Sequence, residues 1–122
     1  MKKILLILCV FWMMIGTANA FQPSEWMEHS KPKTASAAIA TVPGYIYGIW
    51  VATDGTNAVT FTIYDAATAT GTAIFPSFVV PSSSSNRNTT ISFDPPVPYN
   101  TGLYVTGSSS GTYSYDVFYR RK

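Results

Sequence analysis

The chain has 122 residues, of which 47% are hydrophobic and 11% are charged, and its formal net charge is +2. This charge comes from Lys2 and Lys3, because the rest of the chain carries 6 basic side chains (8 − 2 = 6 Lys and Arg) against 6 Asp and Glu. Recognition of nucleic acid requires basic residues clustered on one face, so we expect no nucleic-acid partner. A chain of this length suffices for one domain with a single core.

Residues 1–20 have the pattern of a secretory signal peptide. The two lysines precede an unbroken apolar run over residues 4–15, and small or polar residues follow it. Ala18 and Ala20 fit the A-x-A pattern that signal peptidase reads, which predicts cleavage before Phe21. The product would have 102 residues (122 − 20) and no cysteine. We therefore expect an exported protein without disulfides, either secreted or periplasmic, or held at the cell surface.

An uncleaved membrane anchor is the alternative for this segment. The apolar run is shorter than the roughly 20 residues that span a bilayer comfortably. Residues 4–20 are nevertheless all uncharged, and without cleavage they would hold the domain at the membrane of a cell or of a virion. Cys9 follows Leu8 inside the apolar run, whereas a lipidated cysteine usually follows a small residue. We interpret Cys9 as an ordinary apolar residue of the signal.

Residues 21–41 are predicted to form a linker or arm. Ser24 can cap a single helical turn, but Pro32 and the small residues 34–38 interrupt any longer pattern. We expect this arm to be mobile, or ordered only against a partner. It contains His29, the one histidine of the chain.

Alternating β-rich segments begin at residue 42 and predict the folded domain. Residues 45–52 are rich in Tyr, Ile, Trp and Val, and residues 59–64 alternate apolar side chains with threonine, as a half-buried strand does. The turn between them, Asp54–Asn57, contains Asp-Gly, a pair that tolerates the positive φ of tight turns. We therefore expect these two segments to form a hairpin.

Further strands and turns follow in the C-terminal half. Ala73–Val80 is interrupted by Pro76, which predicts an edge strand or a bulge. A flexible loop is expected at residues 81–88, a short strand at 89–93 and a proline-fixed crossing at 94–100. A second hairpin is expected from residues 103–106 and 112–120, around a Gly/Ser turn. About six or seven strands and no helix predict an all-β fold over residues 42–122: an antiparallel two-sheet sandwich, jelly-roll-like or immunoglobulin-like.

The alternation assigns a buried and an outer face to each strand. The core candidates are apolar or aromatic residues that share one face of each predicted hairpin: Ile49, Val51, Val59, Phe61, Ile63, Leu103, Val105, Tyr113, Tyr115, Val117 and Tyr119. The opposite faces carry four large aromatic residues, which are the candidate partner-binding residues: Trp50, Tyr64, Tyr104 and Phe118. Three interpretations stay open, namely cross-strand aromatic pairing or cover by the arm, a contact between subunits, and a platform for sugars.

No constellation for catalysis or for a cofactor is visible in the sequence. His29 lies in the predicted arm, and the serines cluster in turns, where their hydroxyls bond to the backbone. The carboxylates are scattered singly. Asp54 and Asn57 can offer oxygens to calcium, but the run lacks the ligand number and spacing of a calcium loop. We therefore expect no enzyme, no metal and no cofactor.

Two stretches carry a resemblance to a known group of proteins. One is Gly102–Gly107 followed by Gly111–Arg120, and the other is Thr60–Ala66 followed by Thr70-Gly71-Thr72. Over roughly residues 45–120 the chain resembles small Thr/Gly-rich β-modules of phage structural proteins. The resemblance implies a particle-associated structural or decoration role without catalytic residues. The signal segment departs from this pattern, because ordinary phage capsid proteins assemble in the cytoplasm.

These patterns together predict a non-catalytic exported structural or interaction protein that is a subunit or decoration of a virion or cell-surface assembly. Its expected partners are protein subunits. The alternative is a secreted carbohydrate-binding module, in which aromatic rings stack on sugar faces and turn Asp and Asn side chains bind hydroxyls. Either protein would contact a membrane only through residues 4–20, if these are not removed.

Overall fold

The computed structural model describes residues 27–122. The predicted signal, with Ala18 and Ala20, and the first part of the predicted arm lie outside the described residues. Residues 27–122 form strands and turns without a helix, so this part of the chain has no helix long and apolar enough to cross a membrane.

The described residues form nine strands, two of which have only two residues. In chain order the strands are β1 (Glu28–His29), β2 (Ala37–Ala40), β3 (Gly44–Thr53), β4 (Val59–Asp65), β5 (Thr72–Ala73), β6 (Phe78–Val80), β7 (Asn88–Tyr99), β8 (Leu103–Ser108) and β9 (Tyr113–Arg121). The long strands are rich in Val, Ile, Thr, Tyr and Phe, residue types that fit a pleated, half-buried surface.

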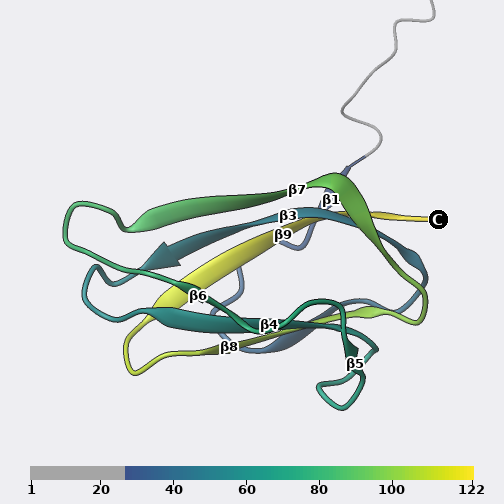
Figure 1. The fold of residues 1–122 in the computed structure, drawn as a ribbon, viewed down its shortest axis with the longest axis horizontal. Coiled ribbons are helices and arrows are strands. Elements are labelled where there is room, and N and C mark those ends of the chain that lie inside the picture. Colours follow the sequence, from purple (N-terminus) through teal and green to yellow (C-terminus); the bar gives the residue numbers. More distant parts are fainter. Residues whose placement is uncertain (1–26) are drawn as a thin grey trace, which may run out of the picture.

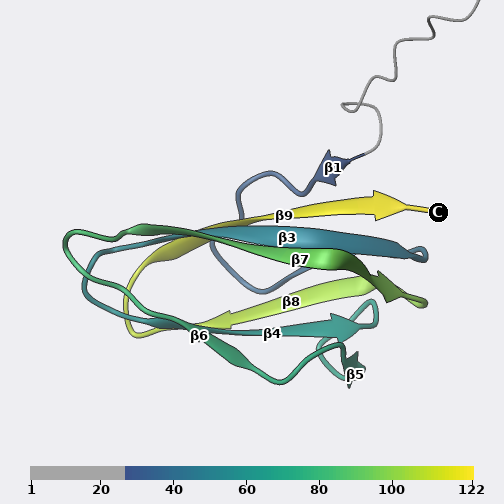
Figure 2. The same ribbon diagram turned by 45° about the horizontal axis from the view of Figure 1, so that its top comes forward.

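The strands form two antiparallel sheets that pack face to face. Sheet A has the order β1-β9-β3-β7, and sheet B has the order β2-β8-β4-β5, with β6 also paired to β4. Figure 2 shows β1, β9, β3 and β7 in one layer and β8, β4, β6 and β5 in the other. The predicted all-β, antiparallel two-sheet sandwich is thereby confirmed.

The pairing is nested around the β4–β5 connection. Strand β4 pairs with β5 and β6, β3 with β7, β2 with β8 and β1 with β9, so the chain forms one long hairpin. This hairpin folds over so that β3 also pairs with β9 and β4 with β8. Such rolled-up pairing is the strand order of a jelly roll, the first of the two predicted architectures.

The two predicted local hairpins are wrong. The turn Asp54–Asn57 joins β3 of sheet A to β4 of sheet B, and the turn at residues 109–112 joins β8 of sheet B to β9 of sheet A. Figure 1 shows both connections, together with that between β6 and β7, at the same end of the sandwich. Alternation specifies which side chains face the core, but it does not specify which strand supplies the hydrogen-bonding partner.

The N-terminal segment is part of the sandwich from Glu28 onward, in contrast to the arm expected up to residue 41. Strand β1 pairs with the C-terminal half of β9, and Lys33 forms a β-bridge with Tyr115. Strand β2 then pairs with β8 in the other sheet. This segment covers one edge of each sheet and pairs backbone N–H and C=O groups of β9 and β8 that would otherwise be exposed.

The expected proline-fixed crossing is also a strand, since residues 94–99 belong to β7. Strand β7 pairs only with β3, so it is an edge at which a missing proline N–H costs no ladder hydrogen bond. A bulge sets residues 93–96 against Tyr47, and the Asp94–Pro95 peptide is cis. The predicted effect of Pro76 is confirmed, because residues 72–80 follow one edge of β4 as two short strands.

The core lies between the two sheets and contains no buried charged side chain among the described residues. The predicted core residues are all buried except Tyr113, which is half-buried against them. Phe61 is at the centre, with its ring centroid 5.9 Å from Phe78, 5.9 Å from Tyr113 and 5.4 Å from Tyr115. The sandwich is therefore held together mainly by apolar burial between the two sheets.

Candidate interaction surfaces

The structure divides the four candidate partner-binding residues into two pairs. Trp50 and Phe118 lie on β3 and β9 and point away from the core of sheet A. Tyr64 and Tyr104 lie on β4 and β8 and point away from the core of sheet B. All four are half-buried, while their chain neighbours on the inner face are buried. The two pairs occupy opposite sides of the sandwich, so the four residues do not form one surface.

The outer face of sheet A mixes aromatic with charged side chains. Trp50 lies opposite Asp116 on β9, and Phe118 lies opposite His29 on β1. Further along the same sheet, the Lys122 ammonium lies 5.1 Å from the centre of the Tyr45 ring, a cation–π contact. Any partner on this face would therefore meet fixed charges beside the rings.

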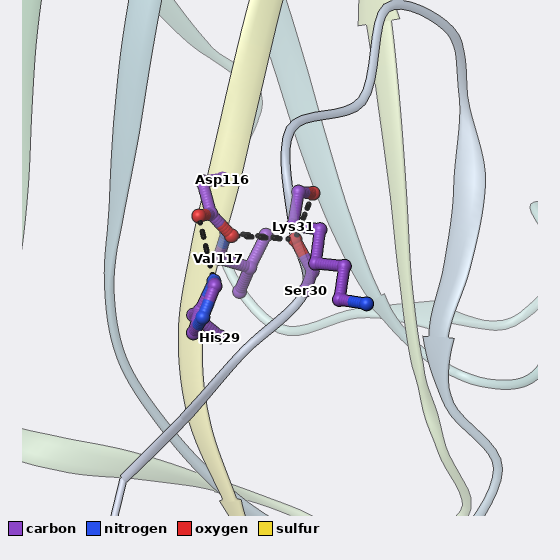
Figure 3. A network of polar contacts seen from close by, with 5 residues as sticks. All are labelled: His29, Ser30, Lys31, Asp116 and Val117. Atoms are coloured by element: carbon purple, nitrogen blue, oxygen red, sulfur yellow. Dashed lines mark hydrogen bonds and ion pairs between the residues drawn. The ribbon is translucent and has the colours of Figure 1, made fainter. Parts of the chain in front are cut away.

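Asp116 connects the N-terminal segment to β9 (Figure 3). Its Oδ2 lies 3.1 Å from Nδ1 of His29, and its Oδ1 accepts a hydrogen bond from Oγ of Ser30 at 2.9 Å. The backbone N–H of Val117 donates to the same Ser30 oxygen at 3.0 Å. Glu28, the residue before His29, forms an ion pair with Arg121, in which Nε of Arg121 donates to Oε1 of Glu28 at 2.8 Å. This hydrogen bond lowers the pKa of Glu28.

Sequence reasoning missed this network because His29 and Asp116 are 87 positions apart and His29 fell in the expected arm. The three residue types are those of a catalytic triad, but their geometry is different. In a triad the serine donates to histidine, which then takes its proton. Here Ser30 and His29 both contact Asp116, and the His29 side chain is 60% exposed. The arrangement fastens β1 to β9 and does not activate the serine.

The outer face of sheet B is built from uncharged cross-strand pairs. Tyr64 lies opposite Tyr104, Thr62 opposite Thr106 and Thr60 opposite Ser108, in successive outward positions of β4 and β8. The outer strands extend two of these rows. Ala38 and Ala73 flank the tyrosine pair, and Val79, which is 60% exposed, lies beside Thr60. We call these nine residues the sheet B face.

The one charged residue in the strands of sheet B does not reach this face. Asp65 ends β4, on the side of the strand that faces the core. Burial raises its pKa, but hydrogen bonds from the backbone N–H groups of Thr101, Asn100 and Gly102 outweigh burial, and the net pKa is lowered. The distance from Thr101 N to Asp65 Oδ1 is 2.6 Å. This carboxylate therefore fixes the β7–β8 connection and leaves the sheet B face without charge.

Asp54 has the corresponding role at the other end of the sandwich. Its Oδ1 accepts hydrogen bonds from the backbone N–H groups of Thr56 and Asn57, both at 2.8 Å, and its Oδ2 accepts from the Asn57 side chain at 2.8 Å. These hydrogen bonds lower the pKa of Asp54 to about 2, and the bond from the Asn57 backbone has the largest effect. Ser110 donates to Oδ1 of Asn57 at 2.8 Å, which links the β3–β4 and β8–β9 turns. The side-chain oxygens of Asp54 and Asn57 therefore accept hydrogen bonds within and between these two turns.

A shallow depression opens beside these turns, with a volume of about 230 Å³. It is lined by Ala52, Thr53, Thr112, Tyr113 and Ser114. Pockets that enclose small molecules measure about 300–1,000 Å³. Among residues 27–122, no three His, Cys, Asp or Glu side chains are grouped to hold a metal ion. The outer faces of the two sheets are the other candidate contact surfaces of the described chain.

Comparisons of the chain with protein families, with curated proteins and with solved structures found no match.

Proposed function

We propose that the chain is a non-catalytic exported structural or interaction protein, a subunit or decoration of a virion or cell-surface assembly. The observation that carries this proposal is the presence of partly exposed aromatic pairs on both outer faces, Trp50 with Phe118 and Tyr64 with Tyr104. Contiguous apolar surface exposed to solvent marks contact sites, and aromatic residues are enriched in protein interfaces. A sandwich with such residues on both sides can contact neighbours in two directions.

Three further features support an assembly role over catalysis. The jelly roll is an architecture of viral capsid and lectin domains, although a fold does not define a function by itself. The resemblance of residues 45–120 to phage structural modules points the same way. The Ser30–His29–Asp116 contacts join strands and do not place a base beside a nucleophile.

The proposal is tested by expressing the full chain in a bacterium, fractionating the cells and weighing the product by intact mass spectrometry. Export gives a species that begins at Phe21 outside the cytoplasm, or a membrane-bound species that retains Met1 if residues 4–20 stay as an anchor. Sedimentation of the purified protein over a wide concentration range should then show species larger than the monomer. A cytoplasmic, strictly monomeric product would contradict the proposal.

A secreted carbohydrate-binding module is the second candidate, because Tyr64 and Tyr104 lie side by side with only alanine on either flank. Two neighbouring rings with threonine hydroxyls nearby can stack on a sugar and bind its hydroxyls. A glycan array read with the wild-type protein and with the variants Tyr64→Ala and Trp50→Ala tests this candidate. Loss of a hit in Tyr64→Ala alone supports it, and an array without hits removes it.

A further inference from the structure

We infer that the sheet B face binds the same face of a second copy of this chain. The inference rests on the proposed function, because it names the surface and the partner through which the subunit assembles. It follows from three properties of this face, namely its lack of charge, the chemistry of its polar groups and its shape.

The first property is electrostatic. The nine residues of the sheet B face are Ala38, Thr60, Thr62, Tyr64, Ala73, Val79, Tyr104, Thr106 and Ser108, and none carries a charge. A two-fold contact brings the same patch of both copies together, so every charge in it loses its water and needs an opposite charge of the other copy in good geometry to offset that cost. An uncharged face avoids this cost. Sheet A has the opposite property, because a two-fold contact there would desolvate both copies of Asp116 and of Arg120.

The second property is the kind of polar group present. The polar side chains of the sheet B face are hydroxyls, from threonine, serine and tyrosine, and a hydroxyl both donates and accepts a hydrogen bond. Hydroxyls from two copies can therefore pair with each other in either direction. A face of acceptors alone, or of donors alone, would be unable to pair with its own copy.

The third property is shape. Two sheets stack face to face about 10 Å apart when their side chains interdigitate. On the sheet B face the bulky Tyr64–Tyr104 pair is flanked by the small residues Ala38 and Ala73, both exposed. The space above each alanine can receive a tyrosine ring from the second copy, in the offset geometry that aromatic rings favour.

The test compares two variants of exposed threonines, one on the outer face of each sheet. Thr60 and Thr90 are both exposed, both face outward and both lie in paired strands, Thr60 in sheet B and Thr90 opposite Trp50 in sheet A. The full chain is purified as wild type, Thr60→Lys and Thr90→Lys, and sedimentation velocity over a concentration series gives the dissociation constant of the self-association. A thermal melt of each variant checks that it is folded.

We expect Thr60→Lys to raise the dissociation constant at least about tenfold, because it places a charge in the contact, and Thr90→Lys to change it less than about twofold. Equal weakening by both variants, or by neither, while the wild type still associates would overturn the inference and leave the proposed function standing. A wild-type protein that stays monomeric would overturn both. A monomer that binds a neutral glycan through Tyr64 would overturn the self-association and identify the face as a sugar site.

Discussion

The two sheets of this sandwich differ in the number of charged side chains that they contain and in what those side chains bind. The strands of sheet A contain the acidic residues Glu28, Asp94 and Asp116 and the basic residues Arg120 and Arg121, and several of these side chains hold the N-terminal segment in place. The strands of sheet B contain only Asp65, which binds the β7–β8 connection. Charged side chains of sheet A therefore bind the N-terminal segment, whereas the sheet B face presents neutral rings and hydroxyls to solvent.

The outward aromatic residues of the two sheets have different cross-strand neighbours. Trp50 and Tyr64 both alternate with buried residues, and both are half-buried. The neighbours distinguish them, because Trp50 lies opposite Asp116 and Tyr64 lies opposite another tyrosine. Cross-strand neighbours determine whether an outward ring belongs to a polar network or to a patch that a partner can cover.

The largest expected effect tests the alternation on which both faces depend. Phe61→Ala should lower the free energy of unfolding by about 3–5 kcal/mol, because a fully buried ring at the centre of the core is lost. Thr60→Ala, one position away on the sheet B face, should change it by less than about 0.5 kcal/mol. Urea denaturation of both variants measures the difference. Similar losses at the two positions would show that β4 does not have one buried and one outer face.

The next effect concerns how sheet A holds the N-terminal segment. Tyr115 and Tyr99 are both fully buried, but only the Tyr115 hydroxyl has a partner, the carbonyl oxygen of Ala35 at 2.9 Å. Tyr115→Phe should therefore cost about 1 kcal/mol of stability, and Tyr99→Phe should be neutral or stabilising by up to about 1 kcal/mol. Thermal unfolding of the two variants gives both values. A reversed order would mean that the contact with Ala35 does not anchor the segment.

A smaller, local effect is expected at the Asp116 network. Asp116→Ala removes the contacts with His29 and Ser30 and should speed amide hydrogen exchange at Ser30 and Val117, while the amides of β4 keep their protection. Asp94→Ala is the matched control, because it removes an exposed carboxylate from the edge strand of the same sheet. If both variants exchange alike at these two amides, the network does not fasten β1.

The smallest expected effect is the acid response of the turn that joins the two sheets. The pKa of Asp54 is about 2 in the folded protein, below its ordinary value of 3.8, so the unfolded chain binds more protons between these values. The stabilisation is complete above about pH 4 and is lost as the pH falls through the folded pKa. Asp54→Asn should flatten the stability profile of the wild type in this window. An unchanged slope in a pH series of denaturant midpoints would contradict the role of the carboxylate.

The local sequence pattern predicted which side chains of each strand are buried, but it did not predict which strands pair with each other. Period-two alternation identified the buried residues Ile49 and Val51 and the outward Trp50 between them, because side-chain direction is a local property of a strand. The choice of partner is not local. The segment 45–52 pairs with β7 and β9, not with the strand that follows it. The predicted hairpins failed for this reason.

The N-terminal strands were missed because edge pairing needs only backbone groups. Ala37–Ala40 and Glu28–His29 lack a strong apolar alternation, and their hydrogen bonds go to the backbone of β8 and β9. The Asp116 network and the sheet B face were also missed, because both depend on which strands lie side by side. The rows of neutral residues on that face become visible only when the register of five neighbouring strands is known.

Hydroxyl-radical footprinting of the wild-type full chain at low and high concentration distinguishes self-association through the sheet B face from self-association through sheet A. If the sheet B face is the contact, oxidation of Tyr64 and Tyr104 falls as the protein associates, while oxidation of Trp50 and Phe118 stays constant. Protection of Trp50 and Phe118 with unchanged Tyr64 and Tyr104 would contradict it and assign the contact to sheet A.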